Sequence, residues 1–154
     1  MDYNCDFPTL STDNRKMYTG GTFDVPHVGH YNFLRKCKEL FPNLRLIVSL
    51  NTDTFIEKYK GKPPLFTYQE REHFLRLCPY VDGIVENTGG SDSKPAILSV
   101  RPSIVIIGND WLEKDYCQQM HFDSAWLTEQ NISVVFIPYT QGISSSEIKR
   151  RLNA

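Results

Sequence analysis

The chain has 154 residues, of which 40% are apolar, and this length suits one folded domain that buries roughly 70% of its unfolded surface. Its formal charge of −1 excludes a broad electrostatic attraction to nucleic acid or to a membrane surface, although a local cationic site needs only a few side chains. No apolar run approaches the roughly 20 residues of a membrane span, and residues 1–16 lack the apolar core of a secretory signal. We therefore expect neither a membrane nor nucleic acid as a partner.

The cysteines are widely spaced, without a CxxC pair, at Cys5, Cys37, Cys78 and Cys117. This spacing argues against a dense disulfide framework and against a zinc ribbon, although a single pair or a single ligand stays open. The expected location is a reducing cytoplasm.

The first third of the chain predicts an extension followed by a strand, a helix and a second strand. Residues 1–15 are rich in Asp, Asn, Ser, Thr and Pro, and we interpret them as an N-terminal extension to a single domain over 16–154. The hydrophobic pattern predicts a strand near 16–20 and an amphipathic helix over 28–41. A compact apolar run over 44–50 predicts a buried strand.

The middle and end of the chain continue the alternation of strands and helices. The lysine-rich residues 55–62 are interpreted as a basic loop or mobile arm, because Pro63-Pro64 breaks the chain directly after them. A helix is predicted from Thr67 to Cys78, with Thr67 and Glu70 spaced as a capping box. The remaining elements are predicted as strands over 81–85, 103–108 and 132–138, and as helices over 94–100, within 113–131 and over 144–152.

This alternation predicts an α/β fold in which helices cover both faces of a parallel sheet. We expect a Rossmann-like, three-layer α/β/α arrangement with five parallel strands. Ligands of such sheets lie at the carboxyl ends of the strands, near the point where the strand order reverses. The residues that attract notice all follow predicted strands, at 20–30, 51–53, 108–111 and 139–146. The pattern therefore predicts one shared site.

The segment 18–30 carries the strongest chemical signal. It passes from a predicted strand through Gly20-Gly21 into a helix, whose start attracts anions through its free N–H groups and its dipole. The two glycines let a phosphate approach the backbone closely. His27 and His30 are three residues apart and lie on nearly the same helix face. Paired imidazoles beside such a turn indicate phosphate chemistry; in the simpler alternative both rings only satisfy local hydrogen bonds.

The run Thr22-Phe23-Asp24-x-x-His27-x-Gly29-His30 resembles the GTFDxxHxGH signature of the cytidylyltransferase family, within the nucleotidyltransferase superfamily. The resemblance implies a HIGH-type nucleotidyltransferase fold, and it implies that both histidines bind phosphate oxygens and stabilise the transition state. It also implies that one or two lysines of the stretch 55–62 contact phosphate. Lys58 and Lys60 are the better matches, and which of them acts stays open.

Two further matches lie in the predicted helix over 67–78 and just after it. Arg71 matches the arginine of the family's YExR helix start, and its alternative role is structural, in pairing with nearby carboxylates. Tyr80-Val81-Asp82 matches the family's RYVD segment, but Pro79 replaces an arginine that takes part in the active site of relatives. Arg76 is considered as a substitute for it.

The run Gly108-Asn109-Asp110-Trp111 resembles the family's GDDW and directly follows a predicted buried strand. The resemblance implies that the backbone near Gly108 helps to recognise the base, and that Asp110 and Trp111 face the acceptor. A turn that holds a half-buried tryptophan is the simpler alternative.

The run over 139–146 resembles the family's RTEGISTT, with Tyr139 in place of the arginine of many relatives. Small hydroxyl groups at a helix start suit phosphate oxygens, because the first-turn N–H groups point the same way. Ser144 and Glu147 are spaced as a second capping box. Capping by Ser144 explains one serine but not three in a row after a glycine loop.

The resemblance implies the transfer of CMP from CTP to a phosphorylated alcohol, with glycerol 3-phosphate as the best guess, giving a CDP-alcohol and pyrophosphate. The acceptor phosphate would attack the α-phosphorus in line, without a covalent enzyme intermediate. The resemblance further implies Mg²⁺ bound through the nucleotide phosphates, without direct protein ligands, and a homodimer. An adenylyltransferase that uses ATP and a non-catalytic nucleotide-binding protein stay open as alternatives.

The implied site contains three groups of residues. The catalytic residues are His27, His30, Lys58 and Lys60. The nucleotide-binding residues are Gly21, Thr22, Phe23, Asp24, Gly29, Gly108, Thr140, Gly142, Ile143, Ser144, Ser145 and Ser146. The acceptor-binding residues are Asp110, Trp111, Tyr139 and Arg76. The shared expectation is that these separated segments converge on one cavity.

Overall fold

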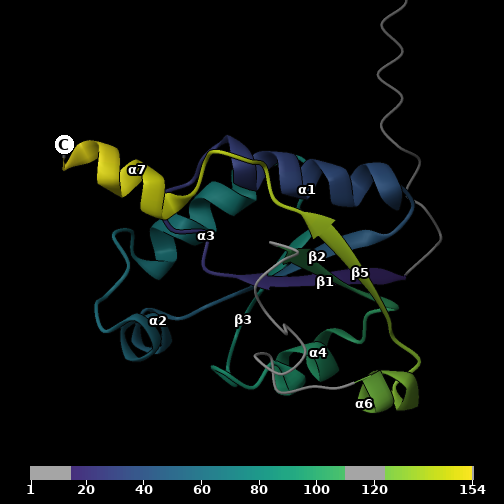
Figure 1. Cartoon of the computed structure of the whole chain (residues 1–154). Coiled ribbons are helices and arrows are strands. Elements are labelled where there is room, and N and C mark those ends of the chain that lie inside the picture. The colour runs from purple at the N-terminus through teal and green to yellow at the C-terminus, as the bar shows by residue number, and fades with distance from the viewer. Residues whose placement is uncertain (1–14, 110–123, 154) are drawn as a thin grey trace, which may run out of the picture.

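A computed structural model describes residues 15–109 and 124–153 (Figure 1). The strands are β1 (Lys16–Gly21), β2 (Arg45–Leu50), β3 (Gly83–Glu86), β4 (Ile104–Asn109) and β5 (Ser133–Pro138). The helices are α1 (Val28–Leu40), α2 (Asp53–Lys60), α3 (Tyr68–Leu77), α4 (Lys94–Val100), α6 (Ser124–Glu129) and α7 (Ser145–Leu152). Of these described helices, none has the length and apolar character that crossing a membrane requires.

The described strands form one parallel sheet in the order β3-β2-β1-β4-β5. β2 and β3 are added on one side of β1, and the chain then crosses back to place β4 and β5 on the other side. The strand order therefore reverses between β1 and β4, which is where ligands of such sheets bind. The predicted five-stranded parallel sheet is confirmed, and the carboxyl ends of β1 and β4 lie at its switch point.

Helices cover both faces of the sheet, so the predicted three-layer arrangement is also confirmed (Figure 1). On one face, α1 and α3 bury Leu34 and Leu75 against the strands. On the other face, α4 buries Ile97, and α6 joins the same apolar cluster. Successive side chains of a strand point to opposite faces, which is why Met17 belongs to the first cluster and Tyr18 to the second.

The two predicted capping boxes have different outcomes. At the start of α3 the box is complete: the Thr67 hydroxyl accepts from Glu70 N at 3.3 Å, and Glu70 Oε2 accepts from Thr67 N at 3.0 Å. At the start of α7 only half of it forms, because Ser144 Oγ accepts from Glu147 N at 3.1 Å. The Glu147 carboxylate pairs instead with the guanidinium of Arg150 at 2.6 Å, one turn further along the helix. The expectation of a reciprocal box at Ser144 was therefore wrong.

The expected basic loop over 55–62 was also wrong, because most of it belongs to the helix α2. The Thr52 hydroxyl accepts from Phe55 N at 3.1 Å and caps the start of the helix. Gly61, with a φ of 77°, ends it in the left-handed conformation that glycine adopts readily. Ile56 is the buried residue of α2, and one apolar position gives too weak a periodic signal to reveal a helix from sequence.

Candidate active site

A cavity of about 730 Å³ lies at the carboxyl ends of the strands. Its lining comes from residues 19–24, His27, Gly29, His30, Phe33, Lys60, Gly108, residues 139–145 and Glu147. The segment after β1, the segment after β5 and the end of β4 therefore border the same space, with a lysine from the end of α2. The volume lies in the range of small-molecule sites. Three of the predicted segments thus converge on one cavity, whereas residues 51–53, which were also expected there, are not among its lining residues.

The paired histidines form the cap of α1 with their own side chains. Gly29 N donates to His27 Nδ1 at 3.0 Å, and His27 N donates to His30 Nδ1 at 3.3 Å, so the two rings take the parts that Ser and Glu have in an ordinary capping box. The rings stack with centroids 3.8 Å apart. Because each Nδ1 accepts a backbone N–H, each neutral ring carries its proton on Nε2 and can donate from there. The local hydrogen bonds of the two rings therefore use Nδ1 and leave Nε2 available to donate to an anion.

Both imidazoles are held in their neutral form. Burial, with a smaller contribution from the neighbouring His27, lowers the pKa of His30 to about 4, although Asp24 opposes the shift. Burial also lowers the pKa of His27. At neutral pH the pair consequently offers two uncharged N–H donors to the cavity. Neither ring is an imidazolium that could act as a general acid.

These shifts predict that stability falls as the solution is acidified. A histidine with an unfolded pKa near 6.5 and a folded pKa of about 4 binds more protons when the chain is unfolded. The contribution of His30 to the free energy of unfolding is therefore fully present above pH 6.5, and it is lost as the pH falls from 6.5 to about 4. Urea unfolding at a series of pH values measures this decline. The His30→Gln variant, which keeps a capping acceptor, should show a shallower decline, and an unchanged slope would contradict the assignment to His30.

Two glycines of the first motif make room for aromatic rings, Gly29 for His27 and Gly21 for Phe23. A Cβ on Gly29 would lie 2.8 Å from His27 Cε1, and a Cβ on Gly21 would lie 2.8 Å from the Phe23 ring. The Phe23 ring packs against His30 with centroids 5.2 Å apart. Phe23 and Val25 have φ values of 51° and 49°, which is costly for side chains of these shapes. Such strain is characteristic of backbone that its surroundings hold in place for a function.

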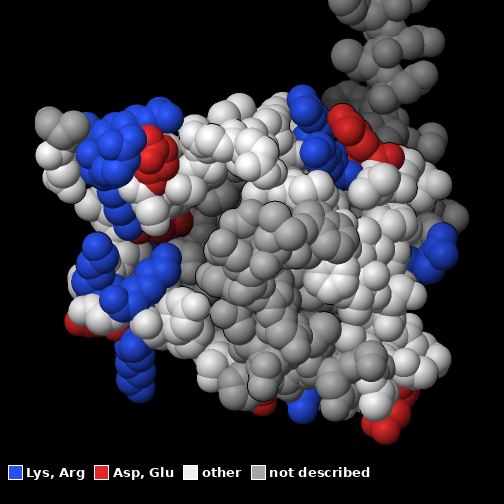
Figure 2. Space-filling model, in the orientation of Figure 1, with Lys and Arg blue, Asp and Glu red and all other residues white. Residues whose placement is uncertain are grey.

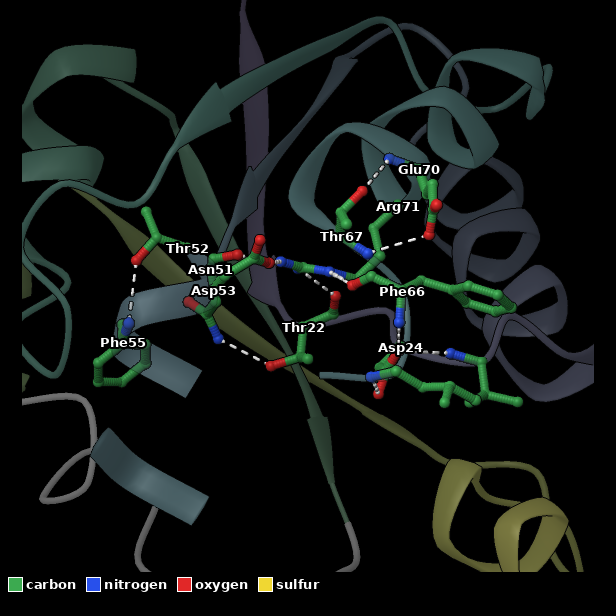
Figure 3. A network of polar contacts seen from close by, with 12 residues as sticks. Thr22, Asp24, Asn51, Thr52, Asp53, Phe55, Phe66, Thr67, Glu70 and Arg71 are labelled. Carbon is green, nitrogen blue, oxygen red and sulfur yellow. Dashed lines mark hydrogen bonds and ion pairs between the residues drawn. The ribbon is translucent and has the colours of Figure 1, made fainter. Parts of the chain in front are cut away.

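Asp24 is buried at the wall of the cavity and ties three segments together. Its carboxylate accepts from the backbone N–H of Phe66 at 2.9 Å (Figure 3). It also accepts from the backbone N–H of Leu65 at 2.9 Å and from Lys149 Nζ at 2.8 Å. Its carbonyl oxygen accepts from the Ser145 hydroxyl. Burial alone would raise the pKa of Asp24, but these hydrogen bonds outweigh it and hold the pKa below its ordinary value. Asp24 thus acts as an anchor that attaches α7 and the loop before α3 to the first motif.

Arg71 is fully buried and joins the first motif to the second strand–helix junction. Its guanidinium donates to the carbonyl oxygens of Thr22 and Asn51 at 2.8 Å each and to that of Phe66 at 3.0 Å. It also pairs with Asp53 at 2.7 Å (Figure 3). These contacts favour the structural alternative considered for Arg71. They also make this arginine the fixed centre behind the cavity.

Basic side chains lie near the cavity, whose own charged lining residues are Lys60, Asp24 and Glu147. Figure 2 shows Lys and Arg side chains gathered on the side of the molecule formed by α7 and the region of α2. Lys60 borders the cavity, whereas Lys58 borders a separate depression of about 420 Å³ together with Asn87 and Gly90. Burial lowers the pKa of Lys60, the nearby Lys149 lowers it further, and Asp24 opposes the shift. Among the described lining residues, Lys60 is therefore the cation that would attract a polyanion such as a nucleoside triphosphate.

The segment after β5 brings an aromatic ring against the end of β4. A Cβ on Gly108 would lie 2.3 Å from Tyr139 Cε1, so the absence of a side chain there allows the ring to sit on the backbone. Thr140 Oγ1 accepts from Asn32 Nδ2 at 3.2 Å, which fixes the loop to α1. Gly142, with a φ of 79°, then turns the chain toward the start of α7.

Other predicted residues lie away from the cavity or outside the described chain. Ser146 is exposed and is not among the residues that line the cavity. Arg76 has a side chain 66% exposed and pairs with Glu72 at 2.7 Å, on the outer surface of α3. Asp110 and Trp111 lie outside the described residues. The sequence assigned no role to Asn51 or Asn87. In the structure Asn51 contacts Thr22 of the first motif, and Asn87 contacts Asn51. The position of Asn51 directly after a strand was the one signal in the sequence that pointed to it.

Comparison with known proteins gives matches over most of the chain. A family model described as cytidylyltransferase-like matches residues 18–151. The glycerol-3-phosphate cytidylyltransferase of Bacillus subtilis is 32% identical over 138 residues, which cover 90% of this chain and 97% of that protein. The FAD synthase of Pyrococcus abyssi is 32% identical over 130 residues, which cover 80% of each chain. A lipopolysaccharide core biosynthesis protein from Thermoplasma volcanium shares the fold, with a TM-score of 0.64, 22% identity, and coverage of 83% of this chain and 98% of that one.

Proposed function

The chain belongs to the cytidylyltransferase-like family, and from that premise we propose that it transfers CMP from CTP to a phosphorylated alcohol, with release of pyrophosphate. Its relatives are nucleotidyltransferases, and the chain is an enzyme of this class. The observation that carries the proposal is the convergence of the histidine-capped start of α1, Lys60 and the hydroxyl-bearing start of α7 on one cavity. Glycerol 3-phosphate is the proposed acceptor, because a relative that acts on it aligns over nearly its full length.

The proposed reaction is an in-line displacement at phosphorus. An oxygen of the acceptor phosphate forms a bond to the α-phosphorus of CTP, the bond from that phosphorus to the bridging β-oxygen breaks, and pyrophosphate leaves with the electron pair. The protein contributes position and hydrogen bonds rather than a covalent intermediate. His27 and His30 would donate from Nε2 to the oxygens on which charge develops.

Magnesium is proposed to enter with the substrate. Triphosphate oxygens are ligands that Mg²⁺ prefers, and the bound ion would neutralise part of the phosphate charge. Among residues 15–109 and 124–153, no group of three His, Cys, Asp or Glu side chains is placed to hold a metal ion. The residues of this chain that would hold the nucleotide phosphates border the cavity: Thr22, Ser144 and Lys60 through their side chains, and Ser145 through its backbone N–H, because its hydroxyl donates to Asp24.

An adenylyltransferase that uses ATP is the second candidate. The observation that favours it is the FAD synthase relative, which is as similar in sequence as the cytidylyltransferase relative. The two candidates differ in the base and in the acceptor, while the phosphate chemistry is common to both.

A pyrophosphate-release screen distinguishes the two candidates. The purified chain would be incubated with Mg²⁺ and either CTP or ATP, in the presence of glycerol 3-phosphate, phosphoethanolamine, phosphocholine or FMN. Release with CTP and one of the phosphorylated alcohols is the expected result. Release with ATP alone would refute the cytidylyltransferase and support the second candidate.

Lys60, rather than Lys58, is expected to contact the phosphates. Lys60→Ala should lower kcat/KM about ten- to a hundredfold, since a hydrogen bond to a charged group contributes about 1.5–3 kcal/mol. Lys58→Ala is the matched comparison from the same helix, and a clearly smaller loss is expected because Lys58 borders the other depression. Steady-state kinetics measure both variants. A larger loss for Lys58→Ala would reverse the assignment.

The proposal also includes the homodimer that the resemblance implies and a cytoplasmic location. Sedimentation equilibrium of the purified chain tests the homodimer, and a monomer at all concentrations would refute it.

Cys37 and Cys78 are both buried free thiols. Burial raises the pKa of Cys37 to about 12, so this thiol is unreactive at neutral pH.

A further inference from the structure

We propose that Asn87 and Asn51 form a relay that fixes the direction of the Thr22 hydroxyl, so that its proton is offered to phosphate in the cavity. The relay deepens the proposed function and rests on it. Asn87 and Asn51 are positioning residues in this scheme, because they act on the ligand only through Thr22.

The relay begins at the side-chain amide of Asn87, whose donor atom is fixed by its hydrogen bond to a backbone carbonyl. Asn87 Nδ2 donates to the carbonyl oxygen of Gly90 at 2.8 Å and to Asn51 Oδ1 at 2.8 Å. A carbonyl oxygen only accepts, so the atom facing Gly90 must be the nitrogen of the amide. The buried Oδ1 of Asn87 has no hydrogen-bond partner in the part of the chain that the structure describes. The side chain thus keeps this orientation although it leaves one acceptor unused.

The second step transfers this polarity to Thr22. Since Asn51 Oδ1 accepts from Asn87, the Asn51 nitrogen faces Thr22, and Asn51 Nδ2 donates to Thr22 Oγ1 at 3.0 Å (Figure 3). A hydroxyl group has one proton and two lone pairs. Because an N–H occupies a lone pair of Thr22, the hydroxyl proton must point elsewhere, and Thr22 borders the cavity. The hydroxyl is therefore a donor toward a ligand oxygen.

The backbone beneath the relay is held independently of the two amides. Arg71 Nη1 donates to the carbonyl oxygens of both Thr22 and Asn51, and Asn51 N donates to the carbonyl oxygen of Gly21 at 3.0 Å. A change of the Asn51 side chain that keeps its shape should consequently alter the direction of the hydroxyl more than it alters the fold.

The test compares Asn51→Asp with Asn51→Leu. Aspartate keeps the shape and still accepts from Asn87, but its second oxygen accepts the Thr22 proton and removes it from the ligand. Leucine loses every hydrogen bond of the amide but captures no proton. A purely structural role predicts that Asn51→Leu is the more damaging change, whereas the relay predicts the reverse for phosphate binding. Calorimetric titration with Mg²⁺ and inorganic tripolyphosphate measures the affinity without reference to the base.

The added charge of aspartate needs its own controls. Thr54→Asp adds the same charge at an exposed position of α2 and should change tripolyphosphate affinity far less than Asn51→Asp. Thr22→Val removes the hydroxyl, so a further Asn51→Asp change should then have little effect, whereas charge repulsion would persist. Thermal unfolding of each variant shows whether the fold is retained. If Asn51→Asp does not fold, Asn51→Leu is combined with Thr22→Val instead, and the relay predicts that the two losses are not additive.

About a tenfold loss of tripolyphosphate affinity is expected for Asn51→Asp, together with a rise in the KM for the nucleotide that exceeds the fall in kcat. Equal losses with and without the Thr22 hydroxyl would overturn the relay, as would a greater loss for Asn51→Leu or additive losses in the fallback pair. A wild-type chain that does not bind tripolyphosphate would overturn it too. A chain that binds tripolyphosphate but releases no pyrophosphate from CTP or ATP would refute the proposed function alone.

Discussion

Replacement of His27 by alanine is expected to slow turnover about 10²–10³-fold, by analogy with the loss of one oxyanion donor from an active site. The physical reason is the fixed proton on Nε2: with Nδ1 engaged by Gly29 N at 3.0 Å, the neutral ring can offer only this donor to the cavity. The loss should fall on kcat more than on KM, because the donor acts on charge that develops in the transition state. Pyrophosphate release at saturating substrate measures it.

The capping role of His27 complicates the alanine variant, and asparagine separates the two effects. Alanine removes both the Nε2 donor and the cap of α1, and loss of a cap costs about 1 kcal/mol of stability. Asparagine is itself a preferred cap residue, so His27→Asn should retain the stability of the wild-type chain and still lose the turnover. If His27→Asn were as active as the wild type, the ring would serve only to begin the helix.

The fold was predictable because its signals are local and repeated. The apolar run of β2, the Thr67 cap of α3 and the Ser144 cap of α7 each mark an element without knowledge of its neighbours. The helix α2 escaped because a single buried residue, Ile56, leaves almost no periodicity, and the lysines around it resemble a loop. The site followed from the fold, since the carboxyl ends of parallel strands meet at one edge.

The finer parts of the site depend on contacts between distant residues, which local patterns do not contain. The choice between Lys58 and Lys60 depends on how α2 is oriented about its axis, because this orientation places the two side chains at different depressions. The link between Asn87 and Asn51 joins segments 36 residues apart. The sequence shows that two family arginines are replaced, by Pro79 and Tyr139, but it does not show what surrounds these two positions. At one of these positions the Tyr139 ring lies on the end of β4 and 6.2 Å from the ring of Phe33, measured between centroids.

Arg71→Met is expected to lower the free energy of unfolding by about 3–5 kcal/mol, because three backbone carbonyl oxygens are each left without a donor, at a cost of at least about 1 kcal/mol each. Methionine fills much of the same space but cannot donate. The carbonyl oxygens of Thr22, Asn51 and Phe66 would therefore each lose a donor, and Asp53 would lose its ion pair. Urea unfolding, read from the midpoint at constant slope, measures the change.

Arg76→Met is the matched control, because it removes the same kind of side chain from the same helix at a site 66% exposed to solvent. Its pair with Glu72 is a surface ion pair one turn apart, for which a change of about 0.5 kcal/mol or less is expected. Arg71→Lys keeps the charge but offers a single ammonium in place of the planar fork, so it should recover only part of the loss. Equal effects of the two methionine variants would mean that the first motif and the second strand–helix junction hold together without Arg71. The larger effect at Arg71 would show that the backbone behind the cavity depends on one buried guanidinium.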